Sequence, residues 1–432
     1  MHFSATDVAQ ATGGSLIGAD SVLDGVSFDS RSIAAGQLFV ALVAERDGHD
    51  FVSAAMTDGA GAALVERATG DGTQIVVPDT AAALLRLGAW GRDQLDAEVI
   101  GVTGSVGKTS TKDLAKAALG AGLRTAANER SFNNEQGLPV TILGAADDTQ
   151  ALVLEMGMRG FGQITRLCDI GRPTIGVVTR VAAAHTELVG DIEGVARAKA
   201  ELVQALPGNG IAILNADDER VSAMATMTDA AVLRFGIDEH ADVRITALVL
   251  DGLARPRFRL HTPWGATEVA LAVSGAHMAT NAAAAIAVAG ACGVDVAAAA
   301  AAMAEATLSP SRMQVGRNRR GTLVINDAYN ANPSSMRAAI EALAAMDVSG
   351  RRIAILGVMA ELADPVADHA MIAELAAEHG VELVAAGTDR YGIVPTEDPT
   401  TVTALLAGDD AVLIKGSLVA GLQRLAAVVL EQ

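Results

Sequence analysis

The chain is poor in cysteine, in aromatic residues and in positive charge. Its two cysteines, Cys168 and Cys292, are too few for a disulfide framework or a cysteine-based zinc site, so we expect a reducing compartment. Lys and Arg number 32 against 51 Asp and Glu, and the resulting net charge of −19 offers no general attraction for nucleic acid. Any anion-binding site must therefore be local.

Apolar residues make up 50% of the chain but aromatic residues only 3%, so the core consists mainly of Ala, Val, Leu and Ile. This composition excludes intrinsic disorder and suits buried parallel strands covered by Ala-rich helices. The first ten residues lack the basic and apolar regions of a signal peptide. We therefore expect a cytoplasmic protein, with a monomer as the default oligomeric state.

Residues 269–294 contain no Asp, Glu, Lys or Arg and are long enough to cross a bilayer. Polar residues and a glycine interrupt this stretch, namely Ser274, Gly275, His277, Thr280 and Asn281. Its second half is mostly Ala. A strand, a turn and an Ala-rich helix therefore explain it better than a membrane span.

Short apolar segments alternate with helical patterns along most of the chain, which predicts βαβ units and a parallel sheet. The clearest strand candidates are residues 99–102, 152–154, 175–178 and 211–214, followed after a break near residue 310 by 323–325, 353–356, 383–384 and 412–414. Between the two series, residues 243–273 show the alternation and the turns of antiparallel hairpins. We predict an α/β protein of three domains, at residues 1–82, 83–310 and 311–432.

The strongest local signal is a Gly-rich segment that follows a predicted strand and opens a predicted helix. It consists of Thr103, Gly104, Ser105, Val106, Gly107, Lys108, Thr109 and Ser110. Its glycines let backbone N–H groups turn toward phosphate oxygens, Lys108 can reach the outer phosphates, and the Thr109 hydroxyl can hold Mg²⁺. The standard phosphate loop has Gly six residues before the Lys, where this chain has Val102. The alternative is a Gly-rich turn with an exposed lysine.

Two residues with metal-binding side chains follow neighbouring strand candidates. Glu155 ends the strand at 152–154, and His185 lies beyond the strand at 175–178. Open α/β sheets bind ligands at the carboxyl ends of their strands, where a carboxylate beside a phosphate loop is a natural Mg²⁺ ligand. Taken alone, such a Glu is more often solvated and such a His more often a structural hydrogen-bond partner.

Three polar clusters also lie after predicted strands or before predicted helices. They are FNNEQGLP at residues 132–139, DAYNANP at residues 327–333 and KGS at residues 415–417. Asn, Asp, Gly and Pro favour ordinary loops as well. Their positions nevertheless favour ligand binding, because βα proteins place ligands there.

Together these motifs resemble the Mur ligase family, the ATP-dependent amide-forming enzymes of peptidoglycan precursor synthesis. The resemblance extends over nearly the whole chain and includes the spacing of the phosphate loop. It implies a UDP-sugar-binding first domain, a central parallel-sheet P-loop ATPase domain and a C-terminal Rossmann-like domain that binds the incoming dipeptide. Within the family, the motifs at 133–139 and 329–333 resemble the member that joins D-alanyl-D-alanine to UDP-N-acetylmuramoyl-tripeptide.

The resemblance also implies roles for single residues. Lys108, Lys199 and His185 are the implied catalytic residues. Lys108 would contact ATP phosphates, Thr109 and Glu155 would bind one Mg²⁺, and His185 and a carbamylated Lys199 would hold a second. Without the resemblance, Lys199 is best interpreted as an exposed helical lysine. The other implied contacts are Asn281, Arg312 and Asp327 to the nucleotide, Asp29, Ser30 and Arg31 to the UDP-sugar, and Asn133, Asn134, Tyr329, Asn330, Asn332 and Lys415 to the substrates.

The implied reaction passes through an acyl phosphate, with domain closure excluding water. Three positions depart from the family pattern: Arg180 replaces the usual Asn, Val358 the usual Asp and Leu418 the usual Arg. Two rival hypotheses stay open, a folylpolyglutamate synthase-like ligase and a nucleotide-dependent switch. The motifs also leave open diaminopimelate or lysine as the third peptide residue, and D,D-dipeptide or depsipeptide as the second substrate.

Overall fold

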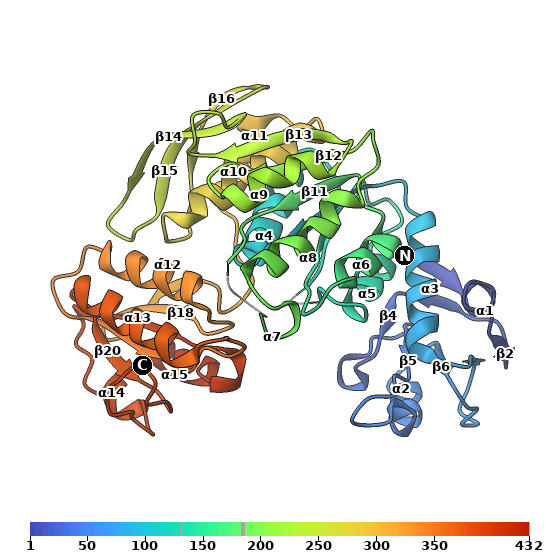
Figure 1. Ribbon diagram of the computed structural model, residues 1–432. Coiled ribbons are helices and arrows are strands. Elements are labelled where there is room, and N and C mark those ends of the chain that lie inside the picture. Colours follow the sequence, from blue (N-terminus) through green and yellow to red (C-terminus); the bar gives the residue numbers. More distant parts are fainter. Residues whose placement is uncertain (130–131, 183–185, 432) are drawn as a thin grey trace.

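The computed structural model describes residues 1–129, 132–182 and 186–431. Three successive sheets, each with its own helices, organise the molecule (Figure 1). The blue first part and the orange-to-red last part lie on opposite sides below the green and yellow middle part. This arrangement confirms the predicted α/β class.

The first part contains a mixed sheet in the order β2-β7-β6-β5-β4 and a separate antiparallel pair, β1 with β3. The strands are β1 (His2–Ser4), β2 (Ser15–Ile17), β3 (Val22–Asp24), β4 (Val26–Ser27), β5 (Leu38–Val40), β6 (Ala62–Val65) and β7 (Gln74–Val76). The helices are α1 (Ala5–Thr12), α2 (Val52–Thr57), α3 (Thr80–Asp93) and the 3-10 turns η1 (Ser30–Ser32) and η2 (Gly48–Phe51). The predicted domain boundary after residue 82 falls inside α3 and stays a prediction.

The middle sheet has nine strands in the order β16-β15-β14-β13-β12-β11-β8-β10-β9. They are β8 (Glu98–Thr103), β9 (Thr125–Ala127), β10 (Ala151–Glu155), β11 (Ile175–Val178), β12 (Ile211–Asn215), β13 (Ala231–Gly236), β14 (Val243–Leu250), β15 (Pro256–Thr262) and β16 (Gly265–Ala270). Strands β8 to β14 run parallel, whereas β15 and β16 are antiparallel. The predicted parallel sheet with appended hairpins is therefore confirmed.

Helices cover both faces of the middle sheet, which explains why five of the six residues of β8 are buried. On one face lie α4 (Lys108–Leu119), α10 (His277–Ala291) and α11 (Val296–Ala304); on the other lie α5 (Gly137–Gly144), α6 (Gln163–Gly171) and α8 (Ile192–Gln204). Shorter elements are α7 (Thr186–Val189), α9 (Glu219–Ala223) and η3 (Met224–Met227). Because its side chains are mostly Ala, α10 packs closely along α4.

The last sheet has the order β17-β18-β21-β19-β20, parallel except for β17. Its strands are β17 (Gln314–Arg317), β18 (Leu323–Asp327), β19 (Arg352–Leu356), β20 (Glu382–Ala385) and β21 (Ala411–Lys415). Its helices are α12 (Pro333–Ala344), α13 (Pro365–Glu378), α14 (Thr400–Thr403), α15 (Gln423–Glu431) and the turn η4 (Leu418–Ala420). This is the Rossmann-like arrangement predicted for the end of the chain.

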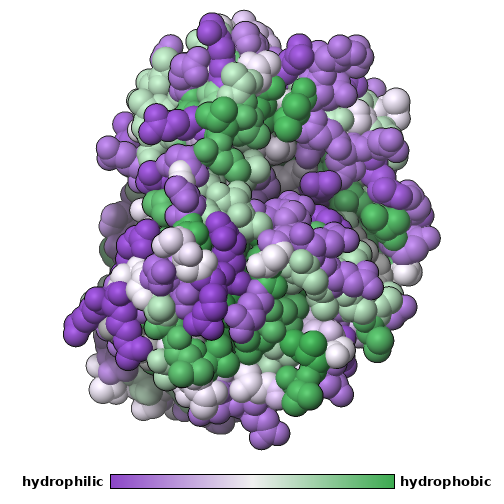
Figure 2. Space-filling view, turned by 90° about the vertical axis from the view of Figure 1, so that its left-hand side faces the viewer, coloured by the Kyte–Doolittle hydropathy of each residue, from purple (hydrophilic) through white to green (hydrophobic). Residues whose placement is uncertain are grey.

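The stretch at 269–294 forms the end of β16, a turn and α10, as predicted. Within the described part of the chain, no helix combines the length and the apolar character that crossing a membrane requires. On the face shown in Figure 2, apolar side chains form separate patches between polar ones.

Candidate active site

A cavity of about 800 Å³ lies between the middle and last sheets. Its walls come from the carboxyl ends of strands in both sheets, where open α/β sheets bind ligands. The cavity brings together most of the predicted site residues. Those that line it are Ser105, Val106, Gly107, Lys108, Thr109, Ser110, Asn133, Asn134, Glu155, Lys199, Asn281, Arg312, Asp327, Tyr329, Asn330, Asn332 and Lys415.

The phosphate loop joins β8 to α4 through two glycines in the left-handed region, Gly104 (φ 151°) and Gly107 (φ 85°). A Cβ on Gly104 would overlap Thr179 Oγ1, and one on Gly107 would lie 2.7 Å from Asn281 Oδ1, so both positions require glycine. Lys108 Nζ donates to the Gly104 carbonyl at 2.7 Å and is partly buried, and this burial lowers the pKa of Lys108. The alternative of an exposed lysine is therefore wrong.

Glu155 is 1% exposed, which rules out the solvated carboxylate considered above. Its Oε1 accepts from Asn133 Nδ2 at 2.7 Å, and its backbone N–H donates to Asn128 Oδ1 at 2.5 Å. Its Oε2 is buried and has no hydrogen-bond partner among the residues that the structure describes. A buried carboxylate oxygen without a partner, on a cavity that Thr109 also lines, fits the ligand set of a Mg²⁺ ion.

Among the residues that the structure describes, no three or more His, Cys, Asp or Glu side chains form a cluster that could hold a metal ion by themselves. A metal on Glu155 would therefore need further oxygens, such as those of the Thr109 hydroxyl and of nucleotide phosphates. This agrees with Mg²⁺, which usually binds through one or two carboxylates together with substrate phosphates.

Lys199 lies in α8 and is 2% exposed. The interpretation of Lys199 as an exposed helical lysine is therefore wrong, because the face of α8 that carries it packs toward the sheet and cavity. Burial, assisted by the nearby charge of Lys108, lowers the pKa of Lys199 well below its usual value. Its amine is thus favoured in the neutral form. The predicted metal ligand His185 lies outside the described residues.

The last sheet contributes a buried ion pair to the cavity wall. Lys415 Nζ lies 2.5 Å from Asp327 Oδ2 and donates to the Asn330 carbonyl at 2.9 Å. Burial lowers the pKa of Lys415, and Asp327 partly opposes this effect. Arg312 stacks over the Tyr329 ring, with its guanidinium carbon 4.2 Å from the centroid. Lys415, predicted to bind substrate, is thus already paired within the protein.

Two asparagines of the predicted substrate motifs shape their own loops. Asn332 caps α12, because its Oδ1 accepts from Ser335 N–H at 2.9 Å. Asn134 Oδ1 accepts from Gly137 N–H at 2.9 Å at the start of α5. The ordinary-loop interpretation is therefore partly right for both motifs, although both asparagines line the cavity.

The predicted UDP-sugar residues do not line the cavity. Asp29, Ser30 and Arg31 lie at the turn η1, where the Arg31 guanidinium donates to both Asp29 carboxylate oxygens at 2.8 Å. Phe28 and Phe132 have ring centroids 5.7 Å apart, which places this turn beside the 132–139 motif. The turn therefore lies near the segment whose Asn133 and Asn134 line the cavity.

Sequence reasoning missed several residues that organise the site. Thr179 Oγ1 donates to the Val106 carbonyl at 2.6 Å and so shapes the phosphate loop. Asn215 Nδ2 donates to the Thr179 carbonyl at 2.7 Å. Both residues lie at or just after the ends of strands β11 and β12, the signal that pointed to Glu155. His277 opens α10 on the cavity wall, and burial lowers its pKa to about 4.

Two of the three positions that depart from the family pattern, Arg180 and Leu418, line the cavity. Arg180 follows β11 of the middle sheet and is exposed; Leu418 follows β21 of the last sheet and is 60% exposed. Val358 is not among the lining residues, and its carbonyl accepts from the Ser417 N–H at 3.0 Å.

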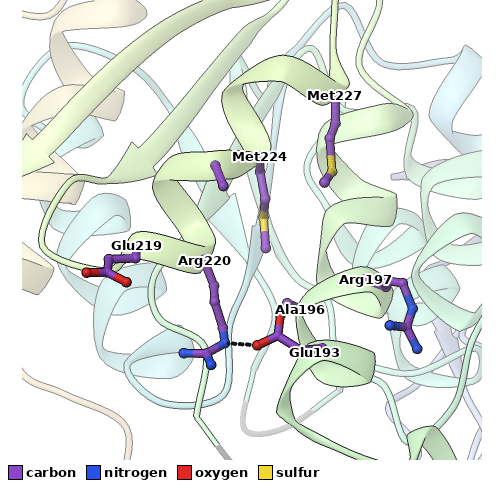
Figure 3. Close-up of a pocket in the computed structure, with 8 residues that line it drawn as sticks. Glu193, Ala196, Arg197, Glu219, Arg220, Met224 and Met227 are labelled. Carbon is purple, nitrogen blue, oxygen red and sulfur yellow. Dashed lines mark hydrogen bonds and ion pairs between the residues drawn. The ribbon is translucent and has the colours of Figure 1, made fainter.

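A second pocket, of about 320 Å³, lies between α8 and the segment of α9 and η3 (Figure 3). Met224 and Met227 line it together with Arg220, whose Nε donates to Glu193 Oε1 at 2.7 Å. None of the predicted site residues lies in this pocket. Its lining offers no buried polar group without a partner, so the chemistry is assigned to the larger cavity.

Comparison with known families decides what this architecture is. The Mur ligase middle domain matches residues 102–289, and the Mur ligase glutamate ligase domain matches residues 311–418. The chain belongs to the Mur ligase family. It is therefore an ATP-dependent, amide-bond-forming ligase, and the resemblance inferred from its motifs is confirmed.

Individual Mur ligases are similar to the chain over most of its length. The UDP-N-acetylmuramoyl-tripeptide–D-alanyl-D-alanine ligase of Mycobacterium bovis is 42% identical over 397 residues, which cover 84% of this chain and 78% of the relative. The crystal structure of MurF from Acinetobacter baumannii has a TM-score of 0.89 at 29% identity and covers 100% of this chain and 99% of that one. MurF from Thermotoga maritima, solved with ADP, has a TM-score of 0.79 at 26% identity over 94% and 97% of the two chains.

Proposed function

We propose that this Mur ligase joins D-alanyl-D-alanine to UDP-N-acetylmuramoyl-tripeptide, converting ATP to ADP and phosphate and giving UDP-N-acetylmuramoyl-pentapeptide for peptidoglycan synthesis. The observation that carries the proposal is the single cavity shared by the phosphate loop and the 327–333 loop. The name of the 42% identical relative supports the substrates, and the ADP of the Thermotoga relative supports the nucleotide. The identity to that relative also favours this activity over a folylpolyglutamate synthase-like ligase.

A carboxylate must be activated before it can form an amide, because its oxygen is a poor leaving group. In the proposed reaction, an oxygen of the peptide's terminal carboxylate attacks the γ-phosphorus of ATP and the bond to ADP breaks. The amine of the dipeptide then attacks the acyl carbon, the carbon–oxygen bond to phosphate breaks, and the amine gives up a proton. Phosphoryl transfer depends on positioning and charge neutralisation, which Lys108 and the loop N–H groups provide.

Thr109 and Glu155 would hold a Mg²⁺ ion on the nucleotide, and the unpartnered Oε2 of Glu155 supports this assignment. When bound, such ions neutralise charge on the transferring phosphoryl group. His185 and a carbamylated Lys199 would hold a second ion. For carbamylation, the neutral amine of Lys199 attacks CO₂, a carbon–nitrogen bond forms and one proton leaves. The buried site and the lowered pKa of Lys199 favour this step.

The proposed binding regions follow the three parts of the chain. Asp29, Ser30 and Arg31 would contact the UDP-sugar, and Asn281, Arg312 and Asp327 the nucleotide. The loops at 133–134 and 329–332 would contact the peptide substrates, with the last part receiving the dipeptide. Lys415 would act by holding Asp327 and the Asn330 carbonyl in place. The free state of both cysteines agrees with a cytoplasmic location.

The test is an ADP-release assay, with the product identified by mass, over a panel of UDP-muramoyl peptides and D,D-dipeptides. We expect release only when ATP, a UDP-muramoyl-tripeptide and D-alanyl-D-alanine are all present. Release with folate and glutamate instead, or ATP hydrolysis independent of any peptide, would refute the assignment. Lys108→Ala should lower kcat by roughly a hundredfold or more, as loss of one transition-state donor does. Lys116→Ala, an exposed change on the same helix, is its control.

A further inference from the structure

A hydrogen bond connects the helix of the phosphate loop to the linker that leads into the last sheet. Asp113 Oδ2, in α4, accepts from the backbone N–H of Ser309 at 2.7 Å. Ser309 lies between the end of α11 at Ala304 and the start of β17 at Gln314. The contact joins residues 196 positions apart in the sequence.

Asp113 is also tied into the interior of the middle part. Its Oδ1 lies 2.8 Å from Lys112 Nζ, and the two side chains are only 11% and 3% exposed. Lys112 Nζ also donates to the Asn128 carbonyl at 2.7 Å. This pair is therefore unlike an exposed ion pair, since water screens it weakly and both partners have a second hydrogen bond.

Asn128 continues the chain of contacts to the cavity. It is 2% exposed, its Oδ1 accepts from Glu155 N–H at 2.5 Å, and its Nδ2 donates to the Phe132 carbonyl at 2.5 Å. Its side chain therefore holds both the end of β10 and the start of the 132–139 motif. Polar contacts thus lead from Ser309 through Asp113 and Lys112 to the backbone carbonyl of Asn128, and from the Asn128 side chain to the backbone N–H of Glu155.

The far end of the linker is held by the last part of the chain. Met313 N–H donates to Asp327 Oδ1 at 3.1 Å. Ser311 (φ 57°) and Met313 (φ 46°) both adopt the left-handed conformation that residues other than glycine seldom take. Between the two attachments the backbone therefore has a defined, unusual conformation, and any reorientation of the last sheet must pass through it.

We infer that Asp113 is a positioning residue that fixes the pivot of the last domain at Ser309 and couples this pivot, through Lys112 and Asn128, to Glu155. Asp113 lies outside the cavity and contacts no proposed substrate group. Asp113 affects the reaction by fixing where the last sheet lies relative to the phosphate loop. The coupling to Glu155 rests on the metal-binding role proposed for that residue, whereas the pivot at Ser309 does not.

The experiment compares four variants of the full chain by hydrogen exchange and by steady-state kinetics. Asp113→Ala removes both contacts, and Asp113→Asn keeps an acceptor for the Ser309 N–H but loses the charge facing Lys112. Asp295→Ala removes the cap of α11, which packs on α4, and so controls for simple destabilisation. Lys116→Ala controls for a change on the exposed face of α4.

In Asp113→Ala we expect the Ser309 amide to exchange at least roughly tenfold faster and kcat to fall by roughly tenfold, with the KM for ATP within about twofold of the parent. Asp113→Asn should retain the protected amide and recover part of kcat. Asp295→Ala should lose stability with kcat unchanged. If Asp113→Ala does not fold, Ser309→Pro removes the same donor without altering α4 and should show the same fall in kcat.

An unchanged Ser309 amide or an unchanged kcat in Asp113→Ala would overturn the inference. So would an equal loss of kcat in Asp295→Ala at the same loss of stability. Glu155→Gln tests separately whether Glu155 binds Mg²⁺. If Glu155 does not bind the ion, the activity of Glu155→Gln should depend on the Mg²⁺ concentration as that of the parent does. The exchange of the Ser309 amide in Asp113→Ala is then still decisive for the pivot.

Discussion

Asp327 and Lys415 face each other at the ends of two neighbouring parallel strands, β18 and β21, and form a buried ion pair with a 2.5 Å contact. Asp327 also accepts from the Met313 N–H, so the pair holds the linker as well as the cavity wall. Both carboxylate oxygens of Asp327 are thus used within the protein. The pair therefore fixes this part of the cavity wall through contacts within the protein.

Asp327→Asn should lower the free energy of unfolding by about 3 kcal/mol, because it leaves the Lys415 ammonium buried without its counter-charge. Urea denaturation at neutral pH measures this change. Arg337→Ala, which removes an exposed pair with Glu341 in the same part of the chain, should cost no more than about 0.5 kcal/mol. Equal effects of the two substitutions would show that the Asp327–Lys415 pair is not effectively buried.

Lys199→Ala should inactivate the enzyme, and a short carboxylic acid added to the assay should restore part of the activity by supplying the missing oxygen ligand. Arg197→Ala changes an exposed residue of the same helix and should leave activity intact. Labelled bicarbonate gives a second measurement, since a carbamate signal in ¹³C NMR should be present in the parent and absent in Lys199→Ala. Full activity of Lys199→Ala would refute the second metal site.

His369 should make the stability of the last part depend on pH. It is fully buried, its Nε2 accepts from Met359 N–H at 3.0 Å, and its Nδ1 lies 2.5 Å from the Pro365 carbonyl, so the ring is neutral in the folded state. Burial lowers the pKa of His369 below its usual value. The folded state therefore binds fewer protons than the unfolded state, in which the pKa is about 6.5.

The contribution of His369 to the free energy of unfolding is fully present above pH of about 6.5 and is lost as the pH falls below that value. The free energy of unfolding then falls by at most about 1.4 kcal/mol per pH unit. Urea denaturation between pH 7.5 and 5 (roughly the range of that titration) measures the slope. His369→Asn should be less stable at pH 7.5 and should show a smaller slope than the parent. Parallel pH profiles for the two proteins would contradict the assignment.

Arg180 and Leu418 line the same cavity from the middle and last sheets, which makes compensation between them testable. We predict that Arg180 supplies part of the positive charge that position 418 lacks. Arg180→Asn should then lower kcat/KM, and clearly less so in combination with Leu418→Arg. A double-mutant cycle on kcat/KM measures the coupling. Strictly additive effects would mean that the two positions act independently.

The sequence alone was sufficient where a function depends on contiguous residues. The strand, the two glycines and Lys108 lie within one short segment, so its pattern directly predicted the strand, the glycine turn and the helix start that the structure shows. The Ala-rich run of α10 likewise predicted a helix instead of a membrane span. Parallel strands and appended hairpins followed from hydrophobic patterns with a period of two or 3.6 residues.

Only the tertiary structure decided which polar residues are free to act. Lys199 has the sequence environment of an exposed helical lysine, and only the packing of α8 buries it. Asn332 and Asn134 occur in motifs that suggested substrate contacts, yet local backbone N–H groups take up part of their hydrogen-bonding capacity. The contact between Asp113 and Ser309 joins residues 196 positions apart. No local pattern encodes such a contact, because it depends on how separate helices and sheets pack against one another.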